Sequence, residues 1–159
     1  MASLTANVTA ILSGDTTVVD TTQNHPLGTK AKDVNGNEYI YMQGVASVVL
    51  GSWVSFDEAH VTTRTVADAQ GRLAVAMAAI DATTDFGWFC IYGSVSGLCL
   101  ASFADNGKVY LTSTAGQVDD ADVAGDAVHG AIGRSARDAT SGLATFELNY
   151  SCVLDLAID

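Results

Sequence analysis

The side chains that most often bind metals or carry catalysis are scattered along this chain. His25, His60 and His129 are far apart and form neither an HxH nor an HExxH motif. His60 follows Asp57 and Glu58 closely enough to suggest a weak metal-binding corner. Because no further ligand lies at a zinc-site spacing, we interpret this segment as a solvated loop.

Nucleophilic and phosphate-binding motifs are equally incomplete. The segment GSVSG has Val95 at its centre, where an esterase-type turn requires serine. The triplet DFG at residues 85–87 lacks the glycine-rich loop, strand lysine and HRD loop of a protein kinase. No glycine-rich run leads into Lys-Ser or Lys-Thr. We therefore expect no catalytic residue, no cofactor and no enzymatic activity.

The acidic segment at residues 119–126 is a candidate calcium-binding loop. Residues 119–126 read DDADVAGD, and calcium prefers clustered oxygen ligands. The EF-hand spacing, with its glycine and distal glutamate, is missing, which favours a solvated turn. Calcium binding between Asp119 and Asp126 stays open from the sequence.

Charge and hydropathy exclude several classes of partner. The chain carries 18 acidic and 7 basic residues, a net charge of −11 that repels phosphate backbones, so we expect no nucleic-acid partner. No apolar run reaches the roughly 20 residues of a membrane helix, and the first residues lack the positive charge of a secretory signal. Three cysteines without a CxxC pair, Cys90, Cys99 and Cys152, indicate buried free thiols and synthesis in a reducing cytoplasm.

The composition favours strands joined by turns. Aspartate far outnumbers glutamate, and the 159 residues include 15 glycines. We predict an all-β fold, a compact antiparallel β-sandwich or barrel of about ten short strands. Residues 1–25 would form an N-terminal arm or first strand, and residues 26–159 a single β domain. Leu73–Ile80 suits a buried strand or a short helix, and its flanking turn signals favour the strand.

The clearest turn signal is Asn35-Gly36, which lies between two apolar runs. This pair predicts a β-hairpin with a type I′ turn, in which both central residues have positive φ. Tyr39 and Tyr41 would then share one face of the second strand.

The segment TTDFGWFCIYGSV, residues 83–95, is apolar on both faces of the expected strand. Trp88 and Tyr92 would lie on one face and Phe89 on the other. Burying a large apolar side chain contributes ~1.5–3 kcal/mol, so both faces must be covered, by the same chain or by another protein. The candidate interface residues are Trp88, Phe89, Tyr92, Tyr39, Tyr41 and Trp53.

Taken together, several motifs give the chain a likeness to a known group. Over roughly residues 26–135 the chain contains, in this order, Gly28-Thr29, the Asn35-Gly36 hairpin with its tyrosines, and the strand from Phe86 to Gly93. In these features the chain resembles small structural proteins of tailed-bacteriophage heads, in particular capsid decoration (cement) proteins.

The resemblance implies a β-rich protein on the outside of the expanded shell. Such proteins are often homotrimers and clamp adjacent subunits of the major capsid protein. It also implies a virion location after synthesis in the host cytoplasm. An acidic, turn-rich domain held by many copies at weak interfaces fits this role.

A carbohydrate- or surface-binding β module, such as a fibre or adhesin domain, is the alternative. Its usual signature is a row of exposed aromatic side chains. Trp53, Trp88, Tyr39 and Tyr41 could supply this row.

Overall fold

The computed structural model describes residues 15–154, which form ten strands and no helix. The strands are β1 (Lys30–Lys32), β2 (Glu38–Gln43), β3 (Trp53–Phe56), β4 (Thr62–Arg64), β5 (Gly71–Ala76), β6 (Phe86–Leu98), β7 (Tyr110–Leu111), β8 (Val118–Asp119), β9 (Val128–Gly133) and β10 (Leu143–Val153). The all-β prediction is confirmed. Because no helix is present in this range, none could span a membrane.

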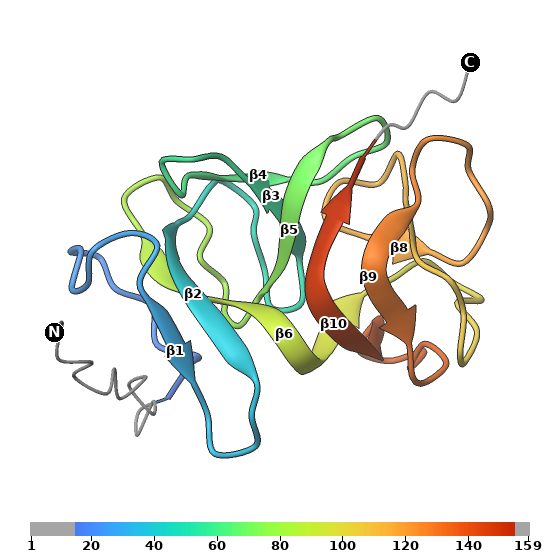
Figure 1. The fold of residues 1–159 in the computed structure, drawn as a ribbon, viewed down its shortest axis with the longest axis horizontal. Coiled ribbons are helices and arrows are strands. Elements are labelled where there is room, and N and C mark those ends of the chain that lie inside the picture. Colours follow the sequence, from blue (N-terminus) through green and yellow to red (C-terminus); the bar gives the residue numbers. More distant parts are fainter. Residues whose placement is uncertain (1–14, 155–159) are drawn as a thin grey trace, which may run out of the picture.

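Eight strands form one antiparallel sheet that curls into a half-barrel (Figure 1). Their order is β1-β2-β6-β10-β5-β3-β4, with β9 added beside β10, and β7 and β8 form a separate small sheet. The long strands β6 and β10 cross the middle of the molecule, between the β1–β2 hairpin and β9. β5 pairs with both of them, and this double pairing curls the sheet.

The central strands are buried on both faces, as the sequence of residues 83–95 predicts. On β6, Trp88 and Cys90 belong to one apolar cluster, and Phe89 and Ile91 belong to a second cluster on the opposite face. The same division runs through β2, β3 and β5. Each central strand therefore separates two cores.

Both cores are covered by segments of the same chain. On the Trp88 face, His25 packs edge-on against Tyr41, with ring centroids 5.0 Å apart, and lies 5.4 Å from Trp88. The segment before it is anchored by Asp20, whose backbone forms a bridge with Phe86. At the other end of this face, the chain between β6 and β9 contributes Phe103 and further core residues. No second protein is required to cover β6.

The uncertain segment Leu73–Ile80 is a strand over its first half. β5 includes Leu73 through Ala76 and pairs with β3 and β6. Ala78 and Ile80 follow outside the strand, and both are buried in the second core. Residues 1–14 of the expected arm lie outside the described residues.

The Asn35-Gly36 hairpin forms, but its predicted turn type is wrong. Only Gly36 has positive φ, at 87°, and the amide of Gly36 donates to the carbonyl of Asp33. This geometry is a type I turn followed by a left-handed glycine. The Asp33 carboxylate stabilises it by accepting from the amides of Asn35 and Asn37, at 2.8 and 3.0 Å.

Replacing Trp88 with alanine tests its place in the core. Because its side chain is 6% exposed, we expect Trp88→Ala to lower the free energy of unfolding by ~3–5 kcal/mol in urea titrations. Val34, which is 85% exposed, supplies the control, and Val34→Ala should stay within ~0.5 kcal/mol of the original protein. Equal stability of both variants would contradict the two-core description.

Two glycines with positive φ test the packing where the hairpin meets β6. Gly36 has φ 87° and open space around it, whereas a Cβ on Gly93, at φ 97°, would collide with the Asn37 side chain. Gly36→Ala should cost only the backbone strain, ~1–2 kcal/mol. Gly93→Ala should cost ~1–3 kcal/mol more, measured by urea unfolding, because Asn37 is held in place. Equal costs would show that Asn37 moves aside freely.

Candidate functional site

The two longest strands change face at the same level of the sheet. On β6 the core side chains are Trp88 and Cys90 before Gly93 but Val95 after it. On β10 they are Phe146 and Leu148 before the change but Val153 after it. Since side chains alternate along a strand, each change from even to odd numbers requires a local irregularity.

Both irregularities are β-bulges. On β6, Ile91 has no partner in β2, because Tyr39 pairs with Cys90 and Glu38 with Tyr92. On β10, three residues separate Leu148 from Cys152, whereas one residue separates their partners on β9. A bulge bends its strand and re-aims the side chains around it.

The paired bulges direct two tyrosines outward. Tyr92 and Tyr150 are 39% and 50% exposed, and their rings pack with centroids 5.4 Å apart at an interplanar angle of 36°. Tyr150 has φ 48°, a strained conformation for a residue other than glycine. The ammonium of Lys30 lies 5.7 Å from the centroid of the Tyr150 ring. We call Tyr92, Tyr150 and Lys30 the tyrosine platform.

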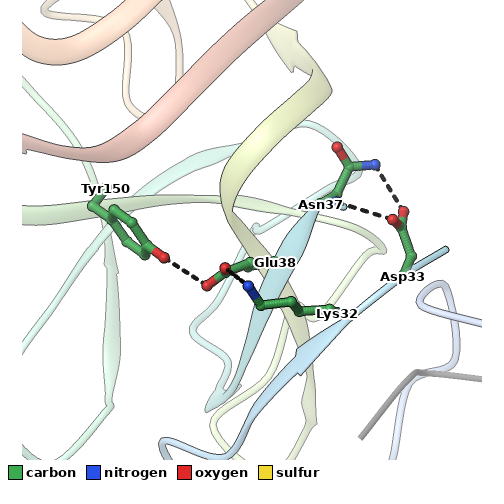
Figure 2. A network of polar contacts seen from close by, with 5 residues as sticks. All are labelled: Lys32, Asp33, Asn37, Glu38 and Tyr150. Atoms are coloured by element: carbon green, nitrogen blue, oxygen red, sulfur yellow. Dashed lines mark hydrogen bonds and ion pairs between the residues drawn. The ribbon is translucent and has the colours of Figure 1, made fainter. Parts of the chain in front are cut away.

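Glu38 holds Tyr150 of the tyrosine platform in place through its carboxylate (Figure 2). Its Oε2 accepts a hydrogen bond from the Tyr150 hydroxyl at 2.7 Å, and its Oε1 pairs with the ammonium of Lys32. Burial alone would raise the pKa of Glu38, but the bonds from Lys32 and Tyr150 and the charge of Lys30 lower it overall. The ionised carboxylate therefore holds β1, β2 and β10 together.

A second set of bonds joins the hairpin to β6 beside the platform. The Asn37 amide group donates to Asp33 at 2.7 Å (Figure 2). Its Oδ1 accepts from the backbone amide of Ser94 at 2.9 Å. Burial would raise the pKa of Asp33, whereas hydrogen bonds from Asn37 and Tyr39 lower it overall. Asn37 thus connects the hairpin to β6 next to the platform.

A pocket of about 80 Å³ opens next to the platform and shares Lys30 and Tyr150 with it. Strands β1, β2, β3, β5, β6 and β10 all contribute to its lining. We call it the front pocket, and its lining residues are Lys30, Ile40, Phe56, Arg72, Leu73, Ile91, Tyr150 and Ser151.

Five of the six expected interface residues are core residues in the single chain. Only Tyr92 is exposed, and it belongs to the platform. The buried five are Trp88, Phe89, Tyr39, Tyr41 and Trp53, with exposures between 0% and 6%. The chain's own segments cover both faces of the sheet, so of the six residues only Tyr92 is accessible to a partner in the single chain.

The sequence carries no signal for the outward position of Tyr150. In LATFELNYSCV, apolar residues occupy every second position through Leu148, Tyr150 and Cys152, a pattern that places Tyr150 on the core face. The burial pattern departs from this alternation at Asn149 and Tyr150, where the bulge lies. Lys30 and Arg72 carried no signal either.

The chemistry available at this surface is recognition. The hydrogen bond to Glu38 raises the pKa of Tyr150 above its usual value of 10.0, so its phenol stays protonated and is a poor nucleophile. Burial likewise raises the pKa of Cys90 to about 12 and of Cys99 to about 11, which keeps both thiols unreactive. Exposed tyrosine rings suit packing against apolar or sugar surfaces.

The acidic residues from Asp119 to Asp126 do not converge on one point. Asp120 accepts the amide of Ala104 at 3.0 Å, and the buried Asp126 accepts the amide of Asp68 at 2.7 Å. Over residues 15–154, no group of three or more His, Cys, Asp or Glu side chains is placed to hold a metal ion. The carboxylates of Asp120 and Asp126 are used to order loops.

Comparison with protein-family models, with curated proteins and with solved structures found no match to this chain.

The pH dependence of stability tests the role of Glu38. Because its pKa is lower in the folded than in the unfolded chain, its stabilisation is complete above about pH 4.5 and is lost as pH falls through the folded value. We expect Glu38→Gln to be less stable than the original protein at pH 7, and this deficit to shrink towards pH 3, in urea unfolding at each pH. Glu58→Gln, in the exposed loop after β3, is the control. A deficit independent of pH would contradict the ionic role.

Proposed function

We propose that this chain is a structural virion protein, a capsid decoration protein that binds the outside of a tailed-phage head and clamps adjacent major capsid subunits. It is made in the host cytoplasm, assembles as a homo-oligomer, preferably a trimer, and catalyses no reaction. One observation carries the proposal: a packed tyrosine pair is exposed on a sheet whose other large aromatic side chains are buried or half-buried.

The tyrosine platform is the contact surface in this proposal. Tyr92 and Tyr150 offer a large apolar area whose position is already fixed, so little side-chain entropy is lost on binding. Tyrosine is also among the residues that contribute most to binding at protein interfaces. The platform therefore replaces the six-residue interface expected from the sequence.

The charge of the chain supports a place on the particle exterior. A net charge of −11 repels packaged DNA and also repels other particles. The sequence resemblance to head proteins points to the same location. Many copies at individually weak contacts would hold the protein on the shell.

Carbohydrate binding is the second candidate, and the same tyrosine pair favours it. Aromatic rings beside polar groups are the usual surface for sugar recognition, and here Lys30 and Glu38 flank the rings. The rings are tilted by 36° instead of coplanar, which provides a bent surface and no flat stacking platform. The decoration role is preferred for this reason.

Co-sedimentation of the full chain with expanded tailed-phage heads prepared without it tests the proposal. The original protein should bind saturably and be removable by a chaotrope. Tyr92→Ala should weaken binding by at least about thirtyfold, equivalent to ~2 kcal/mol at a central interface residue, while urea unfolding stays nearly unchanged. Val123→Ala, which truncates another exposed apolar side chain far along the sequence, is the matched control.

The other outcomes are also informative. Saturable binding of the isolated chain to a glycan array, lost in Tyr92→Ala and without binding to heads, would replace the decoration role with carbohydrate recognition. Binding to heads that Tyr92→Ala leaves intact would remove the platform as the contact. A protein that is monomeric in light scattering and indifferent to heads would overturn the proposal.

A further inference from the structure

Four of the basic residues of this acidic chain form ion pairs or hydrogen bonds within the described residues, and three do not. Within residues 15–154, Lys32 and Arg134 form ion pairs with glutamates, and Arg64 and Arg137 donate to backbone carbonyls. Of the seven basic residues, this leaves Lys30, Arg72 and Lys108 without such a partner in the described chain. Two of the three line the front pocket.

Both cations rest on aromatic faces at this pocket. The guanidinium carbon of Arg72 lies 4.6 Å from the centroid of the Phe56 ring. The ammonium of Lys30 lies 5.7 Å from that of Tyr150. Cation–π contact orients a charged group but leaves its hydrogen-bond donors free. Two positive groups with free donors are thus held beside one cavity.

The remaining lining is apolar except for Ser151, whose hydroxyl donates to the carbonyl of Gly130. Ile40, Leu73 and Ile91 are buried and form the interior of the pocket, whereas Lys30 and Arg72 are exposed. The volume of about 80 Å³ is roughly half that of a cavity that accepts benzene. The pocket therefore fits a short aliphatic group and is too small for a sugar ring.

We infer that the front pocket binds a carboxylate carried on a short aliphatic stem. The stem would pack against Ile40 and Ile91, and the carboxylate would accept a bidentate pair of hydrogen bonds from Arg72. Lys30 adds a second positive charge, part of which acts on Glu38. Arg72 is therefore the main anchor. This inference does not depend on the proposed function.

Titration of the ¹⁵N-labelled full chain with butyrate, followed by amide chemical shifts, tests the site. We expect saturable shifts at the amides of the pocket residues and none with the neutral isostere butyramide. Arg72→Gln should raise the dissociation constant about tenfold or more, because a charge-assisted bidentate contact is lost. Arg72 is exposed, so this variant should fold.

Arg134→Gln is the matched control, because it removes the same charge from the pair with Glu147 and not from the pocket. It should leave butyrate binding unchanged, and Lys30→Gln should weaken binding less than Arg72→Gln does. Absence of saturable shifts, an equal response to butyramide, or equal losses in Arg72→Gln and Arg134→Gln would overturn the inference.

A second titration distinguishes the two sources of such a carboxylate. N-acetylglutamate N-methylamide presents a glutamate side chain between two peptide groups, as a partner protein would. Binding of this probe at least as tight as that of butyrate assigns the pocket to an acidic side chain of a partner. Binding of butyrate alone assigns it to a free small carboxylate.

Discussion

A sheet whose central strands are apolar on both faces can exist in water only if both faces are covered. In this molecule β2, β3, β5 and β6 are such strands, and their side chains divide between two cores. The chain satisfies the constraint with its own segments, through residues such as His25 on one side and Ile80 on the other. As a consequence, nearly every large aromatic side chain is buried in the fold and cannot contact a binding partner.

The tyrosine platform lies where β6 and β10 depart from the regular alternation that buries their side chains. Two neighbouring long strands change face together, so Tyr92 and Tyr150 leave the core at adjacent positions. One bulge alone would expose a single ring. The pair is then fixed by Glu38, whose ionised carboxylate is itself buried and bound on two sides. Backbone strain at Tyr150 is thus compensated by a polar contact, which is how strained residues persist at functional sites.

The fold was more predictable from the sequence than the site. Alternating patterns, the Asn35-Gly36 signal and the flanking turns of Leu73–Ile80 predicted the strands, since these depend on local preferences. The turn type was missed because the Asp33 carboxylate, not the Asn-Gly pair alone, sets the loop geometry. Periodicity shows that a face is apolar but not what covers it, and five of the six candidate interface residues are covered by the chain itself. The exposure of Tyr150 was not predictable, because the apolar alternation continues through Tyr150 and Cys152 and places Tyr150 on the core face.

The placement of the basic residues connects the platform to the front pocket. Lys30 and Tyr150 belong to both, so a ligand in the pocket would lie beside the Tyr150 ring of the platform. A partner that packs an apolar surface on the tyrosines and inserts an acidic side chain beside Arg72 would use both features at once. Such a partner would meet positive charge locally on a chain that is otherwise strongly acidic. The long-range repulsion from a net charge of −11 would then disfavour acidic surfaces that cannot reach the pocket, so the net charge would contribute to the selectivity for a partner.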